Sequence, residues 1–271
     1  MAQRILPGFR PSLTFTLAYL GVLVLIPLSA CFMKASSLTW DQFYSAAWTE
    51  RAKAAYGLTF GAALTAAAIN VLLGLLVAWV LVRYEFPMKR FLDSLVDLPF
   101  ALPTAVAGLI YSNLYVENGW LGQFLVPLGI EGAYSRLAIV LVLVFIGLPF
   151  VVRAVQPVLE TFDAEVEEAA ACLGATRGQT FLRVIMPGLL PALITGFALA
   201  FARALGEYGS VVFVSGNMPF RTEIAPVLIV ARLEEFAYAE ATAIAVVLLA
   251  ASFSMLILIN LLERWSQRNH A

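Results

Sequence analysis

The chain has 271 residues, of which 61% are hydrophobic and 13% are charged, and its formal net charge is -1. Soluble domains carry about a quarter of charged residues, so this chain has too few charges to cover a water-facing surface, and a soluble enzyme and a disordered protein are both excluded. The near-neutral charge also argues against a nucleic-acid partner, which would require a basic patch. The remaining class is an integral membrane protein whose surroundings are the lipid bilayer.

Residues that usually perform catalysis are scarce. The one histidine, His270, lies next to the C-terminus, so a catalytic triad or a zinc site in the core is not expected. None of the lysines follows a glycine, which excludes a G-x-x-x-x-G-K-[ST] phosphate loop. We therefore expect a chain that is not an enzyme and binds no cofactor or metal. Any uphill transport must take its energy from a partner or an ion gradient.

Long apolar stretches predict an all-α polytopic membrane protein. A bilayer core of about 30 Å needs roughly 20 apolar residues per helix, and about six stretches are long enough. The predicted spans are 13–33, 57–82, 95–116, 137–155, 192–215 and 238–262. Basic residues are more numerous on the side that holds both termini, which predicts cytoplasmic termini. Those on this side are Arg4, Arg10, Arg83, Lys89, Arg90, Arg153, Arg177, Arg183, Arg264 and Arg268. Those on the other side are Lys34, Arg51, Lys53, Arg136, Arg221 and Arg232.

A short amphipathic segment follows the first span. Thr39-Trp40-Asp41-Gln42 has the pattern of a capping box, and aromatic residues recur at helical spacing after it. This pattern predicts a helix that lies on the outer membrane interface. We divide the chain into an N-terminal span with this periplasmic interfacial segment (1–56), a transmembrane domain (57–262) and a cytoplasmic tail (263–271).

Small residues open the second span. Gly57-x-x-x-Gly61 is followed by Ala62, Ala63, Ala66 and Ala67. Such a stripe lets the backbones of two helices approach closely. We expect it to have a structural role in close helix packing.

The longest predicted cytoplasmic loop, about 156–190, has more helical patterning than a simple connection needs. Asp163 can cap a helix with an acidic first turn, and Gly174 can supply the left-handed residue that ends it. Thr176-Arg177-Gly178-Gln179 is a capping box that predicts a second short helix, which we expect to end at Met186-Pro187-Gly188. Two short helices with a bend between them are suited to a cleft in a partner protein.

This loop resembles that of a known family. Glu168-Ala169-Ala170-x-x-x-Gly174, followed after nine residues by Val184-x-Met186-Pro187, is similar to the EAA loop of bacterial ABC-importer permeases. That family has Ile and Leu where this chain has Val184 and Met186. The resemblance implies a type I permease core of the MetI-like kind, and a loop that docks on a cytoplasmic ABC ATPase dimer where ATP and magnesium bind. It assigns this contact to Asp163, Glu167, Glu168, Ala169, Ala170, Gly174 and Pro187.

Further segments resemble oxyanion importers. Residues 202–209 are similar to molybdate and sulfate importers, and residues 215–219 and 222–224, with the extra first span, are similar to the T-type membrane subunit of sulfate/thiosulfate importers. This resemblance implies a second, W-type permease subunit in a heterodimer, a periplasmic sulfate/thiosulfate-binding protein, and a place in the bacterial inner membrane. An ion-coupled secondary transporter of an oxyanion and a molybdate-type ABC permease remain alternatives.

Two charges and two prolines fall inside the predicted spans. Arg203 and Glu207 lie one helical turn apart, and because a charge at this depth costs about 3 kcal/mol, both should face the bundle interior. They form either a structural ion pair or a gate at which the arginine meets a passing anion. Pro99 and Pro103 interrupt helical hydrogen bonding, so this face should line protein or water. The candidate path residues are Pro99, Pro103, Thr104, Arg203, Glu207, Ser210 and Asn217.

Overall fold

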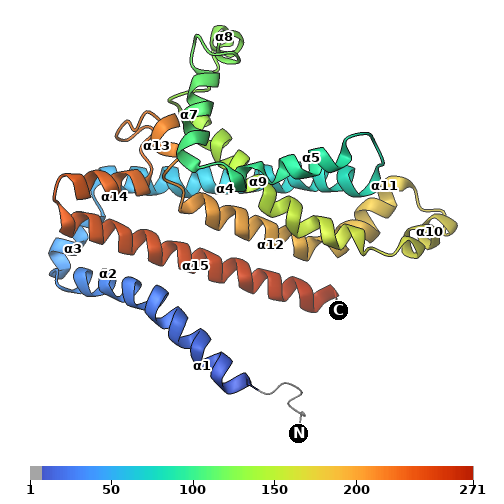
Figure 1. Ribbon diagram of the computed structural model, residues 1–271, viewed down its shortest axis with the longest axis horizontal. Coiled ribbons are helices and arrows are strands. Elements are labelled where there is room, and N and C mark those ends of the chain that lie inside the picture. The colour runs from blue at the N-terminus through green and yellow to red at the C-terminus, as the bar shows by residue number, and fades with distance from the viewer. Residues whose placement is uncertain (1–7, 271) are drawn as a thin grey trace.

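The computed structural model describes residues 8–270, and in this range the chain is helical with no β-strand. Among the described residues, five helices are long and apolar enough to cross a bilayer: Phe9–Ser36, Glu50–Arg83, Arg136–Glu160, Arg177–Leu205 and Tyr238–Leu261. Most of them run along the long axis of the molecule (Figure 1). The predicted all-α polytopic membrane protein is confirmed, with five long spans in place of about six.

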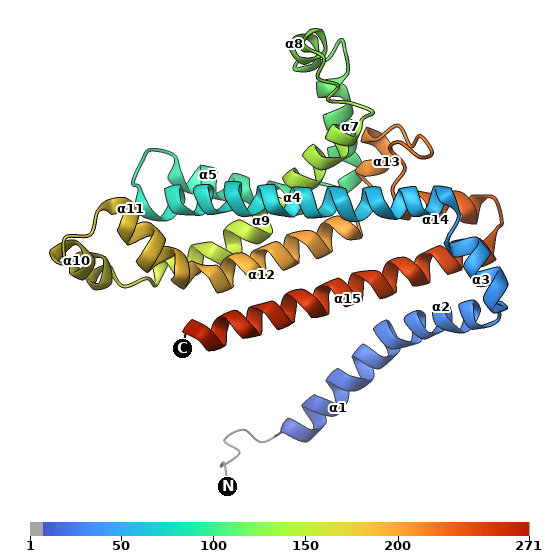
Figure 2. The same cartoon turned by 180° about the vertical axis from the view of Figure 1, so that it is seen from behind.

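The first helix is the least packed part of the structure. α1 (Phe9–Leu20) continues through a π-helical turn (Gly21–Leu25) into α2 (Ile26–Ser36). α1 has no buried residue, and apolar side chains such as Phe15 and Met33 are exposed. Figures 1 and 2 show α1 diverging from α15 (Tyr238–His270) toward its own N-terminal end. Its apolar surface therefore faces outward, where lipid or another membrane helix can cover it.

A short helix, α3 (Trp40–Ala47), joins the first helix to the core. Thr39 Oγ1 accepts a hydrogen bond from the Gln42 amide, and Gln42 Oε1 accepts one from the Thr39 amide, so the predicted capping box is confirmed. Trp40 stacks on Phe43 with ring centroids 6.0 Å apart and remains 77% exposed. An exposed tryptophan on a short helix agrees with a position at a membrane interface.

Three helices form the core: α4 (Glu50–Arg83), α9 (Arg136–Glu160) and α12 (Met186–Leu205). In lipid, close van der Waals contact between backbones replaces the hydrophobic effect in holding helices together. A Cβ added to Gly74 would lie 2.7 Å from Val151 Cβ, and one added to Gly196 would lie 2.9 Å from Val151 Cα. α9 therefore packs at Val151 between a glycine of α4 and a glycine of α12.

The small residues of α4 divide into a packed set and an open set. Ala62, Ala63, Ala66 and Ala67 are buried, as expected. Gly57 and Gly61 are exposed, and a Cβ added to either would have no atom within 4 Å. These two glycines do not pack closely against another helix of the described chain, because the side of α4 that faces the core carries the alanines and Gly74.

The predicted third span, 95–116, is not a single helix. It comprises the end of α5 (Lys89–Val96), the short α6 (Leu98–Ala101) and α7 (Thr104–Tyr115). Pro99 and Pro103 cannot donate backbone hydrogen bonds, and Leu102, which precedes Pro103, is extended with ψ 131°. α7 and α8 (Gly122–Leu125) project from the bundle, whereas α5 lies along it (Figure 1). The proline region therefore turns the chain instead of merely kinking a helix.

The predicted fifth span, 192–215, has different limits in the structure. Its helix begins at α11 (Arg177–Thr180), passes through a π-helical turn (Phe181–Ile185), and continues as α12 to Leu205. In the rest of the predicted span, an irregular stretch begins at Gly206 and is followed by the short helix α13 (Val211–Val214). α14 (Ala225–Glu234) and α15 follow. α15 continues to His270, so residues 263–270 extend the last helix.

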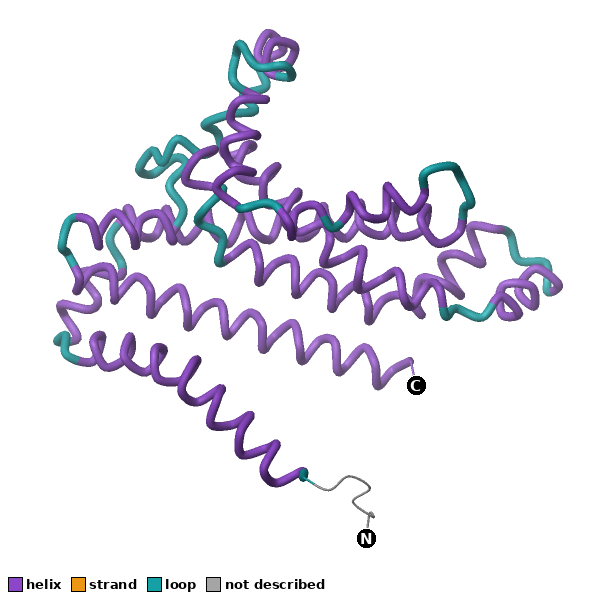
Figure 3. Tube along the Cα trace, viewed as in Figure 1, coloured by secondary structure: helices purple, strands orange, loops and turns teal. Residues whose placement is uncertain are grey.

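Figure 3 shows loops at both ends of the long helices and in the arm that projects from the bundle. α10 (Ala164–Cys172) and α11 lie at one end, and α3 lies at the opposite end with the turn between α14 and α15 (Figure 1). The first described residues of α1 and the last of α15 point toward the end that holds α10. Arg4 and Ala271 lie outside the described residues, as do the side chains of Arg264 and Arg268.

Gly196→Ala is expected to destabilise the protein, because its Cβ would meet the α9 backbone at Val151. Overpacking of this kind costs about 1–3 kcal/mol. Gly61→Ala is the matched control, since its Cβ would enter open space and alanine favours a helix by about 1 kcal/mol. Thermal unfolding in detergent should show a lower midpoint for Gly196→Ala and an unchanged or higher one for Gly61→Ala. Equal midpoints would contradict the packing at Val151.

Candidate functional site

The first half of the long loop is a capped helix, as predicted. α10 follows Asp163, whose Oδ1 accepts a hydrogen bond from the Glu165 amide at 3.0 Å. Glu165 and Glu167 lie in the first turn, where the helix dipole favours carboxylates. The chain then bends at Gly174, whose φ of 82° is in the left-handed region that favours glycine. The predicted helix and its bend are both confirmed.

The second helix starts as predicted but does not end as predicted. Thr176 and Gln179 form the expected capping box, with the Thr176 amide 2.9 Å from Gln179 Oε1. Helical structure then continues through Met186-Pro187-Gly188 instead of ending there. A π-helical turn directly precedes this point, and Pro187, which has no amide to donate, is the second residue of α12. The loop and α12 therefore form one continuous helical unit.

The outer surface of α10 is open. Leu173 is 89% exposed and Val166 is 45% exposed, so the loop presents apolar side chains that a partner protein can cover. Glu167 and Ala170 are partly buried and face the rest of the chain. Several residues of α10 and the position after it are exposed, and we use the name outer surface of the loop for five of them: Val166, Glu168, Ala169, Cys172 and Leu173.

The predicted pair of intramembrane charges is formed. Arg203 Nη1 lies 2.6 Å from Glu207 Oε2, near the end of α12. The Glu207 side chain is 2% exposed, and its Oε1 accepts hydrogen bonds from the Ser210 amide and hydroxyl at 2.9 and 2.8 Å. The Arg203 side chain keeps 33% of its surface exposed. The carboxylate is thus fully partnered within the chain, while the guanidinium keeps an accessible side.

Helix α7 crosses the irregular stretch after α12 at close range. A Cβ added to Gly209 would lie 2.3 Å from Thr104 Oγ1, and one added to Gly108 would lie 2.3 Å from the Ser210 carbonyl oxygen. Thr104, Ser210 and Glu207 of the predicted path set therefore meet where two interrupted spans cross. Interrupted helices place free backbone groups at membrane depth, and transporters use such groups to hold ions and substrates.

The two prolines of the predicted set lie in the turn that leads to this crossing. Pro99 occupies the first turn of α6, and Pro103 directly precedes α7 with φ -57°. The first amides of a helix have no intrahelical acceptor. The start of α7 therefore adds backbone donors beside the Thr104 hydroxyl.

Arg153 of α9 holds the turn from α5 to α6 in place. Its Nε lies 2.9 Å from Asp97 Oδ1 and its Nη2 lies 2.6 Å from Asp97 Oδ2, a bidentate pair. Its Nη1 also contacts Asp93 Oδ1 at 2.7 Å. This network was not predicted from the sequence, because Asp97 and Asp93 lie 56 and 60 positions from Arg153. The available signal was a lone arginine within an apolar helix, which requires a counter-charge.

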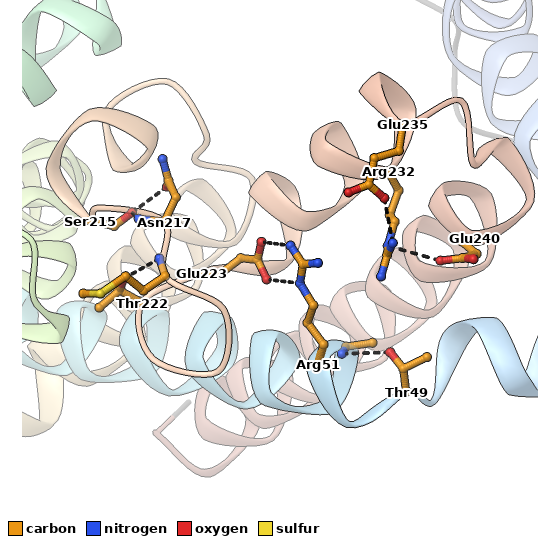
Figure 4. Close-up of polar contacts among 11 residues, drawn as sticks. Thr49, Arg51, Ser215, Asn217, Thr222, Glu223, Arg232, Glu235 and Glu240 are labelled. Atoms are coloured by element: carbon orange, nitrogen blue, oxygen red, sulfur yellow. Dashed lines mark hydrogen bonds and ion pairs between the residues drawn. The ribbon is translucent and has the colours of Figure 1, made fainter.

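Asn217, the last member of the predicted path set, lies in the turn after α13 (Figure 4). Its Oδ1 accepts a hydrogen bond from the Ser215 hydroxyl at 2.7 Å, and its Nδ2 donates to the Val212 carbonyl at 2.8 Å. The φ of Asn217 is 51°, a left-handed conformation that asparagine tolerates well. Its side chain therefore stabilises the outer turn, and its hydrogen bonds do not extend to Arg203.

The same outer segment is fastened to the start of α4 (Figure 4). Arg51 Nε and Nη2 each donate to a Glu223 carboxylate oxygen at 2.7 Å, and the Glu223 side chain is 3% exposed. The partners are 172 positions apart, so no local sequence pattern indicates the pair. Among the described residues, no group of three or more His, Cys, Asp and Glu side chains is placed to hold a metal ion.

Removing the Glu207 carboxylate alone is expected to be worse than removing both charges. Breaking a buried ion pair costs about 3–5 kcal/mol, less here because Arg203 is partly exposed. Glu207→Ala should therefore lower the thermal midpoint by about 5 °C. The double variant Arg203→Met, Glu207→Gln leaves no unpaired charge and should recover most of the loss. A double variant no more stable than Glu207→Ala would contradict this pairing.

Known proteins match nearly the whole chain. Residues 70–269 match the family described as binding-protein-dependent transport system inner membrane component. The sulfate transport system permease protein CysT of Synechocystis is 51% identical over 253 residues, which is 93% of this chain and 88% of that protein. The proteins of the same name in Salmonella typhimurium and Escherichia coli are 48% and 47% identical, each over 97% of this chain and 95% of its own length.

Solved structures show a similar arrangement of helices. A chain of a bacterial ABC transporter involved in the import of the acidic polysaccharide alginate matches with a TM-score of 0.75 over 94% of both chains, at 15% identity. A bacterial alginate ABC transporter in complex with an alginate pentasaccharide-bound periplasmic protein matches with a TM-score of 0.74 and 18% identity. At these identities the likeness extends to the fold and not to the substrate.

Proposed function

The chain belongs to the family of binding-protein-dependent transport system inner membrane components, and we propose that it is the permease subunit of an ATP-driven ABC importer that carries sulfate into the cell. It is a transport subunit and not an enzyme. The observation that carries the substrate assignment is its 51% identity with a sulfate transport system permease over 93% of the chain. The α10 loop and the crossing of the interrupted spans supply the parts that such a permease needs.

The α10–α11 loop is the part that would receive energy from a cytoplasmic ATPase dimer, which binds the ATP and magnesium. Its outer surface offers the Glu168 carboxylate and the apolar Leu173 to a groove in the partner. Asp163 and Gly174 set the two ends of α10. Because Pro187 lies within a continuous helix, displacement of the loop would be passed to α12, whose far end carries Arg203.

The path for the anion is assigned to the crossing of α7 with the stretch after α12. Sulfate is doubly charged and strongly hydrated, so a path that releases it should offer several weak contacts and no tight site. The hydroxyls of Thr104 and Ser210, the first amides of α7 and the partly exposed Arg203 guanidinium are contacts of this kind. Glu207 lowers the local positive charge, so a bound anion could leave again.

The assembly also includes a second permease and a periplasmic protein. Two ATPase sites require two permease subunits, and we assign the other to the W type, in a heterodimer. A solved transporter of the same fold was captured with a periplasmic protein. We assign a sulfate/thiosulfate-binding protein to this chain, since thiosulfate shares the charge and tetrahedral shape of sulfate. The excess of basic residues on one side favours the inner membrane with both termini in the cytoplasm.

Uptake of radiolabelled sulfate by the reconstituted complex tests the function. We expect uptake that requires ATP and the binding protein and that continues when ionophores collapse ion gradients. Uptake without ATP that stops with the ion gradient would instead show an ion-coupled secondary transporter. ATP-driven uptake of molybdate, with none of sulfate, would show a molybdate-type permease.

Leu173→Glu is expected to abolish ATP-driven uptake without unfolding the protein. The side chain is 89% exposed, so the change removes an apolar contact with the ATPase and leaves the chain's own packing intact. Tyr84→Glu is the control, because Tyr84 is 57% exposed at the C-terminal end of α4, near the α10 loop but not part of it. Co-purification of the ATPase and sulfate uptake are measured for both. Full activity of Leu173→Glu would refute the assigned contact.

Arg203→Gln is expected to abolish uptake while the complex stays assembled, because the glutamine amide can still donate to Glu207 but the partly exposed positive charge at the crossing is lost. Arg203→Lys keeps the charge and should retain much of the uptake. Gel filtration of the purified complex checks assembly, and radiolabelled sulfate measures transport. Normal transport by Arg203→Gln would leave the ion pair with a structural role only.

A further inference from the structure

The inner face of α10 is attached to the end of α4 by an ion pair. Arg83 Nη2 donates a hydrogen bond to Glu167 Oε1. Their side chains are largely buried, with 24% and 27% of their surfaces exposed. The pair joins the last residue of a core helix to a loop that lies 84 positions later in the chain.

Two aromatic rings complete this junction. The Arg83 guanidinium carbon lies 5.2 Å from the centre of the Trp79 ring, and Trp79 meets Phe181 edge to face with centroids 5.3 Å apart. Phe181 opens the π-helical turn before α12. Nε of Arg83 is buried and has no hydrogen-bond partner within the described part of the chain. The guanidinium is therefore held by the hydrogen bond from its Nη2 to Glu167 and by the Trp79 ring.

The ion pair also determines which way α10 faces. Consecutive residues of a helix point about 100° apart. Glu167 is turned toward α4, and the next residue, Glu168, is exposed. Holding Glu167 against Arg83 therefore holds Glu168 and the rest of the outer surface of the loop in the direction of a partner.

α4 is fastened by a similar pair at its opposite end. Arg51 binds Glu223 in the segment between α13 and α14, as Figure 4 shows. Between the two pairs, α4 packs against α9 at Gly74. One rigid helix therefore connects the α10 loop to the outer segment on the other side of the molecule.

We propose that Arg83 and Glu167 are positioning residues that link α10 to α4, so that movement of the loop reaches the outer segment through α4 as well as through α12. The proposal rests on the proposed function, because it requires an ATPase that acts on α10. Neither residue touches the substrate. Each acts through the orientation of α10 and the displacement of α4.

The test compares Arg83→Gln, Glu167→Gln and the exchanged variant Arg83→Glu, Glu167→Arg in the reconstituted complex. The readout is the number of sulfate ions imported per ATP hydrolysed, measured beside the amount of ATPase in the complex. Each single variant should keep its ATPase and lose about fivefold in this ratio, the factor that corresponds to an ion pair worth about 1 kcal/mol. The exchanged variant should return to within about twofold of the unchanged protein.

Lys89→Gln is the control, because it removes an ion pair with the 89% exposed Glu85 in the connection between α4 and α5 and should leave the ratio unchanged. Single variants that couple normally would overturn the proposal. Single variants that fail to assemble would support it if the exchange restores both assembly and coupling, and would overturn it if the exchange does not. An unchanged complex without any ATP-dependent uptake would instead overturn the proposed function.

Discussion

The close approach of α4 and α12 to α9 at Val151 is the contact on which the rest of the structure depends. Helices in lipid gain little from hiding apolar surface from one another, so backbone proximity has to supply the packing energy. Gly74 and Gly196 provide it by carrying no Cβ. Because these three helices behave as one body, the loop at one end and the irregular stretches near the middle keep a fixed relation to each other.

Irregular backbone inside a membrane protein needs partners, and this chain supplies them locally. Glu207 accepts two hydrogen bonds from Ser210 where α12 ends. α7 lies so close to the Ser210 backbone that a side chain at Gly108 would collide with it. Such a stretch is tolerated only where protein or water surrounds it. The same polar groups that satisfy the backbone are those that a hydrated anion could exchange with water, which is why stability and transport meet at this crossing.

Local patterns were predicted from the sequence more successfully than distant ones. The caps at Asp163 and Thr176 and the bend at Gly174 depend on residues at most four positions apart, and all were found. The Arg203–Glu207 ion pair, also four positions apart, was one of two interpretations of these charges. The predicted helix end at Pro187 was wrong, because the helix continues through this residue directly after a π-helical turn. At the small residues of α4, the side of the helix on which a glycine lies decides whether it packs against the core. The Arg51, Arg83 and Arg153 pairs join residues far apart in the chain, so no local pattern identifies the partners.

The central claim is that an ATPase covers the outer surface of the α10 loop. Cys172 lies one turn after Glu168 on the same side of α10, and it is exposed. With Cys31→Ser as background, labelling of the Cys172 thiol by a membrane-impermeant maleimide in inverted vesicles reports directly on that surface. The account predicts strong labelling of the chain alone and protection when the ATPase is present. Equal labelling in the two cases would contradict it.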